Sequence, residues 1–69
     1  MDKVITFQTL LKSKDMSMSR LARILGVTPR TVMNWAKGVT TPSFKQIERI
    51  AEVIQESFET VVAVLRNSR

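Results

Sequence analysis

The stretch SRLARILGVTPRTVMNWAKG, which runs from Ser19 to Gly38, decides the fold. Apolar residues recur at helical spacing on both sides of a Gly-Val-Thr-Pro break. Gly26 suits a left-handed helix end because it has no Cβ. Thr28 can cap the free N–H groups of a new helix, and Pro29 loses no hydrogen bond at its first position. The stretch therefore predicts two short helices joined by a tight turn, with the second ending by Gly38.

The second of these helices has two unlike faces. Thr28, Val32 and Trp35 fall on one side. Positions i, i+3, i+4 and i+7 on the other side carry Arg30, Met33, Asn34 and Lys37. An α-helix fits the major groove of B-DNA, where Arg can bind guanine, Asn can bind adenine and Met can pack on a thymine methyl group. If the partner is duplex DNA, this second side would contact its bases.

The sequence also predicts a helix before this pair and the residue at which the first helix of the pair begins. A first helix should extend from about Lys3 to Lys14, followed at Asp15 by a chain reversal in the left-handed conformation. The helix that ends at Gly26 should begin after Ser17 or Ser19. The residues predicted to face the core from these two helices are Val4, Phe7, Leu10, Leu11, Leu21, Ala22 and Leu25.

Two more helices are predicted after Gly38. Ser43 and Gln46 have the spacing of a capping box and start a fourth helix. Ser57 can cap a fifth helix, although the Val-rich segment ETVVAVL is also compatible with a short strand. The core-facing residues predicted for the fourth helix are Phe44, Ile47, Ile50, Ala51 and Ile54. We therefore expect one compact all-α domain of five helices over residues 1–69.

The composition excludes several classes of function. The 69 residues include no Cys and no His, so disulfides, thiolate or imidazole metal sites and a histidine base are all excluded. The carboxylates form no catalytic constellation, since Glu48 and Glu52 share a helical face with Arg49. No apolar run approaches the roughly 20 residues needed to cross a bilayer. We expect a cytoplasmic protein that is not an enzyme and has no metal, cofactor, membrane or small-molecule ligand.

The net charge of +5 is unevenly distributed. Up to Lys45, eight basic residues outnumber two acidic ones, whereas from Gln46 onward three basic residues face four glutamates. A cationic end predicts a polyanionic partner, either nucleic acid or an anionic membrane. A solubilising surface is the alternative that charge alone leaves open. Single-stranded nucleic acid is disfavoured because all four aromatic residues have the phase of core residues.

The segment from Met16 to Val62 contains a set of short sequence motifs. They are Leu21-Ala22, Leu25-Gly26-Val27, Thr31-Val32, Trp35, Gly38, Pro42-Ser43, Ile47 and Ile50-Ala51. Together they resemble the Cro/repressor (Xre-like) type of helix-turn-helix domain, which occurs in phage repressors and small bacterial regulators. The resemblance implies a transcriptional regulator that binds a pseudo-palindromic operator as a homodimer. The first helix of the pair would cross the DNA backbone and the second would enter the major groove.

The resemblance also implies which residues touch DNA. Base contacts are implied for Pro29, Arg30, Met33 and Asn34. Phosphate contacts are implied for Ser17, Met18, Ser19, Arg20, Thr28, Thr31, Lys37, Thr40, Thr41, Ser43 and Lys45. Other roles stay open at this stage: Arg30 could be a solvated charge, and Met33 could fill a gap or join a dimer contact. Trp35 is expected in the core rather than stacked on a base.

The C-terminal end contains more apolar residues than one small core needs, and such a surplus indicates an interface. The residues predicted to form a homodimer interface are Phe58, Val61, Val64 and Leu65, with Ile24 as a further exposed apolar candidate. The rival interpretation is a protein-interaction module on the same scaffold, such as an antitoxin or accessory regulator that binds a different protein. Both interpretations expect an exposed apolar surface on the last helix.

Overall fold

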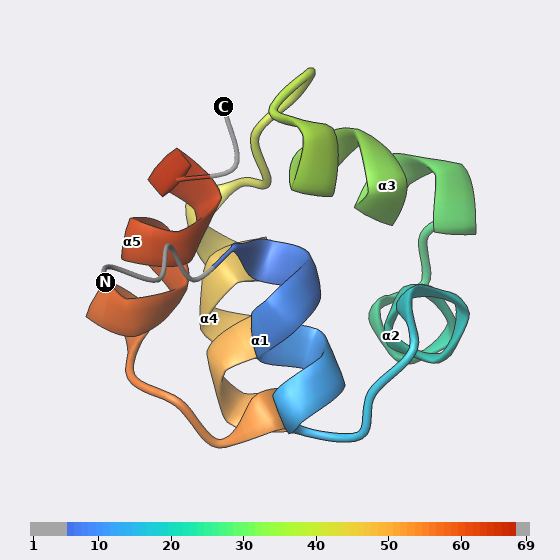
Figure 1. Ribbon diagram of the computed structural model, residues 1–69. Helices are drawn as coiled ribbons and strands as arrows, with labels where there is room; N and C mark the ends of the chain where they lie inside the picture. The colour runs from blue at the N-terminus through green and yellow to red at the C-terminus, as the bar shows by residue number, and fades with distance from the viewer. Residues whose placement is uncertain (1–5, 68–69) are drawn as a thin grey trace.

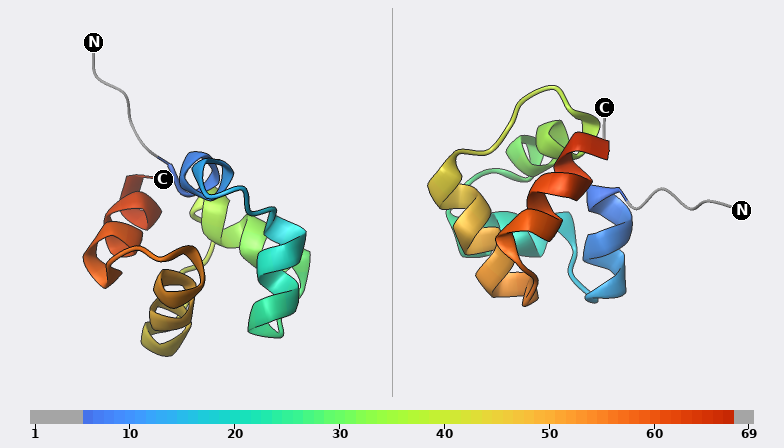
Figure 2. Two further views of the ribbon diagram at one scale, coloured as in Figure 1. Left: turned by 90° about the horizontal axis from the view of Figure 1, so that it is seen from below. Right: turned by 90° about the vertical axis from the view of Figure 1, so that its left-hand side faces the viewer.

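The computed structural model describes residues 6–67, which form five α-helices and no strand. In chain order the helices are α1 (Phe7–Ser13), α2 (Met18–Leu25), α3 (Pro29–Lys37), α4 (Phe44–Ile54) and α5 (Phe58–Asn67). Figures 1 and 2 show α5 on one side of the molecule and the α2–α3 pair on the other, with α1 and α4 between them. The prediction of a compact all-α fold of five helices is confirmed, and the segment ETVVAVL is helical.

Local capping chemistry determines where the middle helices begin. Ser17, Thr28 and Ser43 are the N-caps of α2, α3 and α4. Each side-chain oxygen accepts a hydrogen bond from the backbone N–H three residues later. The predicted capping box is complete, because Gln46 Oε1 accepts a hydrogen bond from the Ser43 N–H at 2.8 Å.

The first helix begins later than predicted. Thr6 is its N-cap, and a reciprocal pair of hydrogen bonds with Thr9 forms a capping box before Phe7. The helix therefore starts at Phe7, whereas the helical periodicity placed its start at about Lys3. Lys3 and Val4, the latter a predicted core residue, lie outside the described residues.

Within residues 6–67, four residues adopt the left-handed conformation where the chain reverses. Gly26 (φ 76°) and Gly38 (φ 77°) end α2 and α3, as their lack of a Cβ predicts. Asp15 (φ 57°) makes the predicted reversal after α1. The fourth is Gln55 (φ 58°), which ends α4 and whose side chain gives it no advantage in this conformation.

Replacing Gln55 by glycine is expected to raise the free energy of unfolding by about 0.5–1 kcal/mol. The left-handed conformation costs a residue with a Cβ roughly 1–2 kcal/mol, and the greater backbone entropy of unfolded glycine offsets part of that gain. Urea denaturation would measure the change. Gln55→Ala keeps the Cβ and serves as the control, so equal stability of the two variants would contradict the explanation.

One apolar core joins all five helices. The large side chains at its centre, each less than 2% exposed, are Phe7, Leu11, Leu21, Val32, Ile50 and Val61. Among the described residues, no buried side-chain nitrogen or oxygen lacks a hydrogen-bond partner and no charged residue is buried. The interior is thus apolar throughout, and the polar side chains of residues 6–67 are left for the surface.

The prediction that Phe44 faces the core is wrong. Its side chain is 65% exposed, and its ring packs on that of Phe58 with the centroids 4.8 Å apart. Phe44 is the first residue of α4, and helical side chains tilt toward the N-terminus, so its ring projects beyond the start of the helix. Leu25, the last residue of α2, is likewise only half-buried.

The predicted homodimer interface also needs correction. Val61, Val64 and Leu65 are only 0%, 4% and 8% exposed, because they pack into the core of their own chain. Phe58 is half-buried against that core. Val61, Val64 and Leu65 complete the core, since α5 packs on both α1 and α4. They are therefore not an apolar surplus available to a partner.

Two polar contacts link helices that are distant in sequence. Lys14 Nζ lies 2.7 Å from Glu56 Oε2, which joins the reversal after α1 to the reversal after α4. Arg49 on α4 donates a hydrogen bond to the carbonyl oxygen of Ile24 in the last turn of α2, at 3.4 Å. A cation is favourable at a helix C-terminus, so Arg49 helps to hold α2 against α4.

Candidate nucleic-acid interface

The candidate site is built on the rigid junction between α2 and α3. The Val27 N–H donates to the Ala22 carbonyl at 2.9 Å, which closes the left-handed turn at Gly26. Ala22 is 1% exposed, and its small side chain allows α3 to pack closely on α2. In Figure 1, α2 is seen almost along its axis while α3 lies across the view, so the two helices cross steeply. This arrangement holds α3 at the edge of the molecule.

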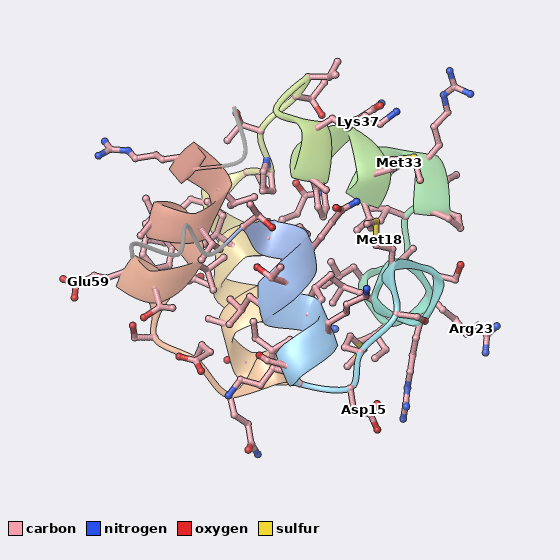
Figure 3. All side chains as sticks on the ribbon, in the orientation of Figure 1. Asp15, Met18, Arg23, Met33, Lys37 and Glu59 are labelled. Atoms are coloured by element: carbon pink, nitrogen blue, oxygen red, sulfur yellow. The ribbon has the colours of Figure 1, made fainter. Side chains whose placement is uncertain are left out.

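The two sides of α3 differ as the sequence predicts. Val32, Trp35 and Ala36 are buried, with exposed fractions of 0%, 3% and 8%. Trp35 therefore belongs to the core, as expected. The residues of the opposite side, which we call the outer face of α3, are Arg30, Met33, Asn34 and Lys37. Figure 3 shows Met33 and Lys37 on this side, directed away from the other helices.

The outer face is not equally accessible along its length. Arg30 and Lys37 are exposed, Pro29 at the start of the helix is also exposed, and Met33 is 42% exposed. Asn34 is half-buried, and its carbonyl oxygen accepts hydrogen bonds from the N–H groups of Val39 and Thr40, where the chain turns back after α3. Arg30, Met33 and Lys37 are thus the protruding side chains, and Asn34 lies at their edge.

The residues predicted to touch phosphates are mostly on the surface. Exposed members of this set are Ser17, Ser19, Arg20, Thr28, Lys37, Thr40, Thr41, Ser43 and Lys45. Several of them surround the N-termini of α2, α3 and α4, where backbone N–H groups of the first turn have no partner within the helix. Such N-termini favour anions.

Two members of the phosphate set are less available than the rest. The Met18 side chain is half-buried and packs against the core, so only its backbone can face a phosphate. Thr31 is half-buried, and its hydroxyl lies 2.9 Å from that of Thr28. The N-cap interaction therefore already engages both hydroxyl groups.

Positive charge around α2 and α3 is not neutralised by neighbouring carboxylates. Within residues 6–67 the one ion pair is that of Lys14 with Glu56, on the α1 and α4 turns. Figure 3 shows Arg23 and Lys37 on the side of α2 and α3, whereas Asp15 and Glu59 point away at other edges of the molecule. The uneven charge of the sequence is thus also uneven in space, and the cationic side includes the outer face of α3.

Other kinds of site find little support in the described part of the chain. No group of three or more Asp, Glu, His or Cys side chains among residues 6–67 is arranged to hold a metal ion. None of the helices formed by these residues is both long enough and apolar enough to cross a bilayer.

Comparison with known proteins agrees with this geometry. A helix-turn-helix family model matches residues 7–61, which include all of α1 to α4 and the beginning of α5. No curated protein and no solved structure matches the chain significantly. The matched region covers more than half of the chain and contains the α2–α3 junction and the outer face of α3. The chain therefore belongs to the Cro/Xre-type helix-turn-helix family, a family of DNA-binding regulators.

Proposed function

We propose that the protein is a transcriptional regulator that binds double-stranded DNA sequence-specifically, with α3 in the major groove. The observation that carries this proposal is the division of α3 into two sides. Val32 and Trp35 anchor the helix in the core, while Arg30 and Lys37 protrude without a carboxylate partner among residues 6–67. A rigidly held helix with protruding donors matches the shape and the acceptor pattern of the major groove.

The proposed contacts follow from the chemistry of each side chain. Arg30 donates two hydrogen bonds to guanine O6 and N7, and Met33 packs on a thymine methyl group. Asn34 bonds to adenine at the edge of the contact, and Pro29 packs against the bases at the start of the helix. The exposed residues of the phosphate set, with Lys37 foremost, bind the DNA backbone and orient α3 in the groove.

A single α3 contacts only a few base pairs, so we propose that two copies act together. A homodimer on a pseudo-palindromic operator places two α3 helices in successive major grooves about 34 Å apart. Two linked contacts raise both affinity and specificity, because the second contact forms at high effective concentration. Occupation of the operator would then regulate transcription, with protein concentration as the control.

The rival function is a module that binds a different protein through the C-terminal end, and it rests on the same apolar surplus as the homodimer, which is smaller than the sequence suggests. The apolar residues that favoured it, Val61, Val64 and Leu65, complete the core of the domain. The apolar side chains that remain exposed include Ile24 on α2 and Phe44 on α4, which lie on different helices. Phe44 packs on Phe58 at the start of α5, whereas Ile24 is on α2.

Selection of bound duplexes from a random DNA pool, at near-physiological salt, tests the proposal. We expect enrichment of an inverted repeat whose half-sites are separated by about one helical turn, roughly 10 base pairs. A pool that retains no common sequence, although the protein binds it, would reduce the interaction to phosphate contacts and contradict sequence-specific binding. An enriched single half-site would support α3 as the reader and contradict the homodimer.

A further inference from the structure

A small hollow lies where the end of α3, the loop after it, α4 and α5 meet. Its volume is about 170 Å3, and its apolar wall consists of Trp35, Pro42, Ile47, Val62 and Leu65. Four of these residues are buried and Val62 is half-buried. Figure 1 shows the last turn of α5 beside the loop between α3 and α4, and the right-hand view of Figure 2 shows the same neighbours. Sequence patterns give no sign of the hollow, because its wall joins segments that are distant in the chain.

The size of the hollow suits a ligand with one ring. An apolar cavity of about 150 Å3 inside a protein can hold a benzene molecule, whereas a drug-sized ligand needs a pocket of about 300–1,000 Å3. The apolar wall surrounds such a ring from three helices, α3, α4 and α5. The hollow is therefore too small for a nucleotide or a folded peptide segment and large enough for a single ring.

The edge of the hollow carries polar groups that have no partner. Arg66 lines it, is exposed and forms no ion pair within residues 6–67. Thr40 and Thr41 also line it and are exposed, and neither hydroxyl group forms a hydrogen bond with the described residues. No carboxylate is among the described residues that line the hollow. A positive charge and two hydroxyl groups beside an apolar wall favour an anion with an apolar body.

The indole of Trp35 adds a further donor. Its N–H forms no hydrogen bond within residues 6–67, although Trp35 is only 3% exposed. The N–H is not sealed inside the core, because no fully buried side-chain nitrogen or oxygen in this part of the chain lacks a partner. The hollow, which Trp35 lines, gives this donor a route to solvent. A ligand that carries acceptor atoms fits these surroundings.

We propose that the hollow binds a small carboxylate with a single ring, and that the bound ligand weakens the binding of DNA. The ring fills the apolar part, and the carboxylate pairs with Arg66 and accepts a hydrogen bond from Thr41 at the edge. The effect on DNA rests on the proposed function, in which Thr40 and Thr41 bind the DNA backbone. A carboxylate beside them repels the nearby phosphates and competes for the same hydroxyl groups, so each ligand lowers the affinity for the other.

Trp35 provides the measurement, because it is the one tryptophan of the chain and lines the hollow. Titration with benzoate should change its fluorescence saturably, with half-saturation at about 0.1–1 mM, an affinity within reach of so small a ligand. Benzyl alcohol has the ring without the charge, and acetate has the charge without the ring. Each should require at least about tenfold higher concentration. An equal response to all three compounds, or no saturable response to benzoate up to about 10 mM, would overturn the inference.

Three variants show whether the hollow is the site. Arg66→Gln removes the charge but keeps a polar side chain, so half-saturation by benzoate should rise about fivefold and that by benzyl alcohol should not change. Arg23→Gln is the matched control, because it makes the same charge change at an exposed position on the side of the molecule opposite α5 (Figure 3), and it should bind benzoate normally. Val62→Phe fills the hollow and should abolish the response with an unchanged circular dichroism spectrum. Unaltered benzoate binding by Arg66→Gln or Val62→Phe would reject this site.

The effect on DNA is measured with the selected operator, at an ionic strength kept constant with sodium chloride. Saturating benzoate should lower the operator affinity of the original protein about fivefold or more and leave that of Val62→Phe unchanged. Equal operator affinity with and without benzoate would contradict the antagonism. The fluorescence titration contains no DNA, so its outcome is separate from that of the proposed function. A protein that selects an inverted repeat but does not bind benzoate would reject the ligand site and leave sequence-specific binding standing.

Discussion

Replacing Trp35 by alanine is expected to lower the free energy of unfolding by about 3–5 kcal/mol. The indole is 3% exposed and lies on the buried side of α3, so its removal leaves a cavity between this helix and the rest of the core. A chain of this length has a total stability of only about 3–10 kcal/mol. The loss is therefore about a third or more of the total stability, and the variant should unfold at a much lower urea concentration.

Urea denaturation followed by far-ultraviolet circular dichroism measures this effect, since the variant loses the one tryptophan of the chain and with it the fluorescence signal. Met33→Ala is the control on the same helix, because Met33 is 42% exposed and its truncation should change stability by less than about 1 kcal/mol. A Trp35→Ala protein that unfolds at the original urea concentration would show that α3 is not anchored through this side chain.

Replacing Arg30 by alanine should leave the stability of the protein almost unchanged but weaken its binding to DNA. Arg30 is exposed and forms no ion pair with the described residues, so stability should change by no more than about 0.5 kcal/mol. Binding to the selected operator should weaken by about 1–3 kcal/mol for each half-site, and the preference for one base should relax. The reason is that, in the proposed complex, the guanidinium would bond to a base edge, and no neighbouring side chain would replace that bond.

Competition binding with operators changed at single positions measures the relaxed preference. Lys37→Ala is the comparison, since a phosphate contact should weaken binding to all sequences alike and reduce the salt dependence by about one counterion. If Arg30→Ala retained the original affinity and base preference, the outer face of α3 would not be the surface that reads DNA.

Much of the fold could be predicted because its decisive features are local. The N-caps at Ser17, Thr28 and Ser43 and the left-handed glycines each depend on a few neighbouring residues. Their positions bound α2, α3 and the start of α4, and the periodicity within α3 separates its buried side from its outer face. The reading surface proposed here could therefore be recognised from sequence as a set of residues.

The features that could not be predicted depend on contacts between distant segments. A row of valines on α5 has the same pattern whether it faces a second copy or its own core, and only the packing of α1 and α4 decides between them. Phe44 has the spacing of a core residue, but periodicity alone does not take into account that it is the first residue of its helix. Likewise, the hydrogen bond from Arg49 to the Ile24 carbonyl joins residues 25 positions apart, and no local sequence pattern predicts it.

The separation of the two sides of α3 has an evolutionary consequence. The side chains that would distinguish one operator from another take little part in the core, whereas those that hold the helix are buried and would not reach the DNA. Mutations at Arg30 and Met33 can accordingly accumulate with little effect on folding. After gene duplication, such a protein could acquire a new set of target genes through a few substitutions. Two descendants in one cell could then control separate genes while sharing an almost identical interior.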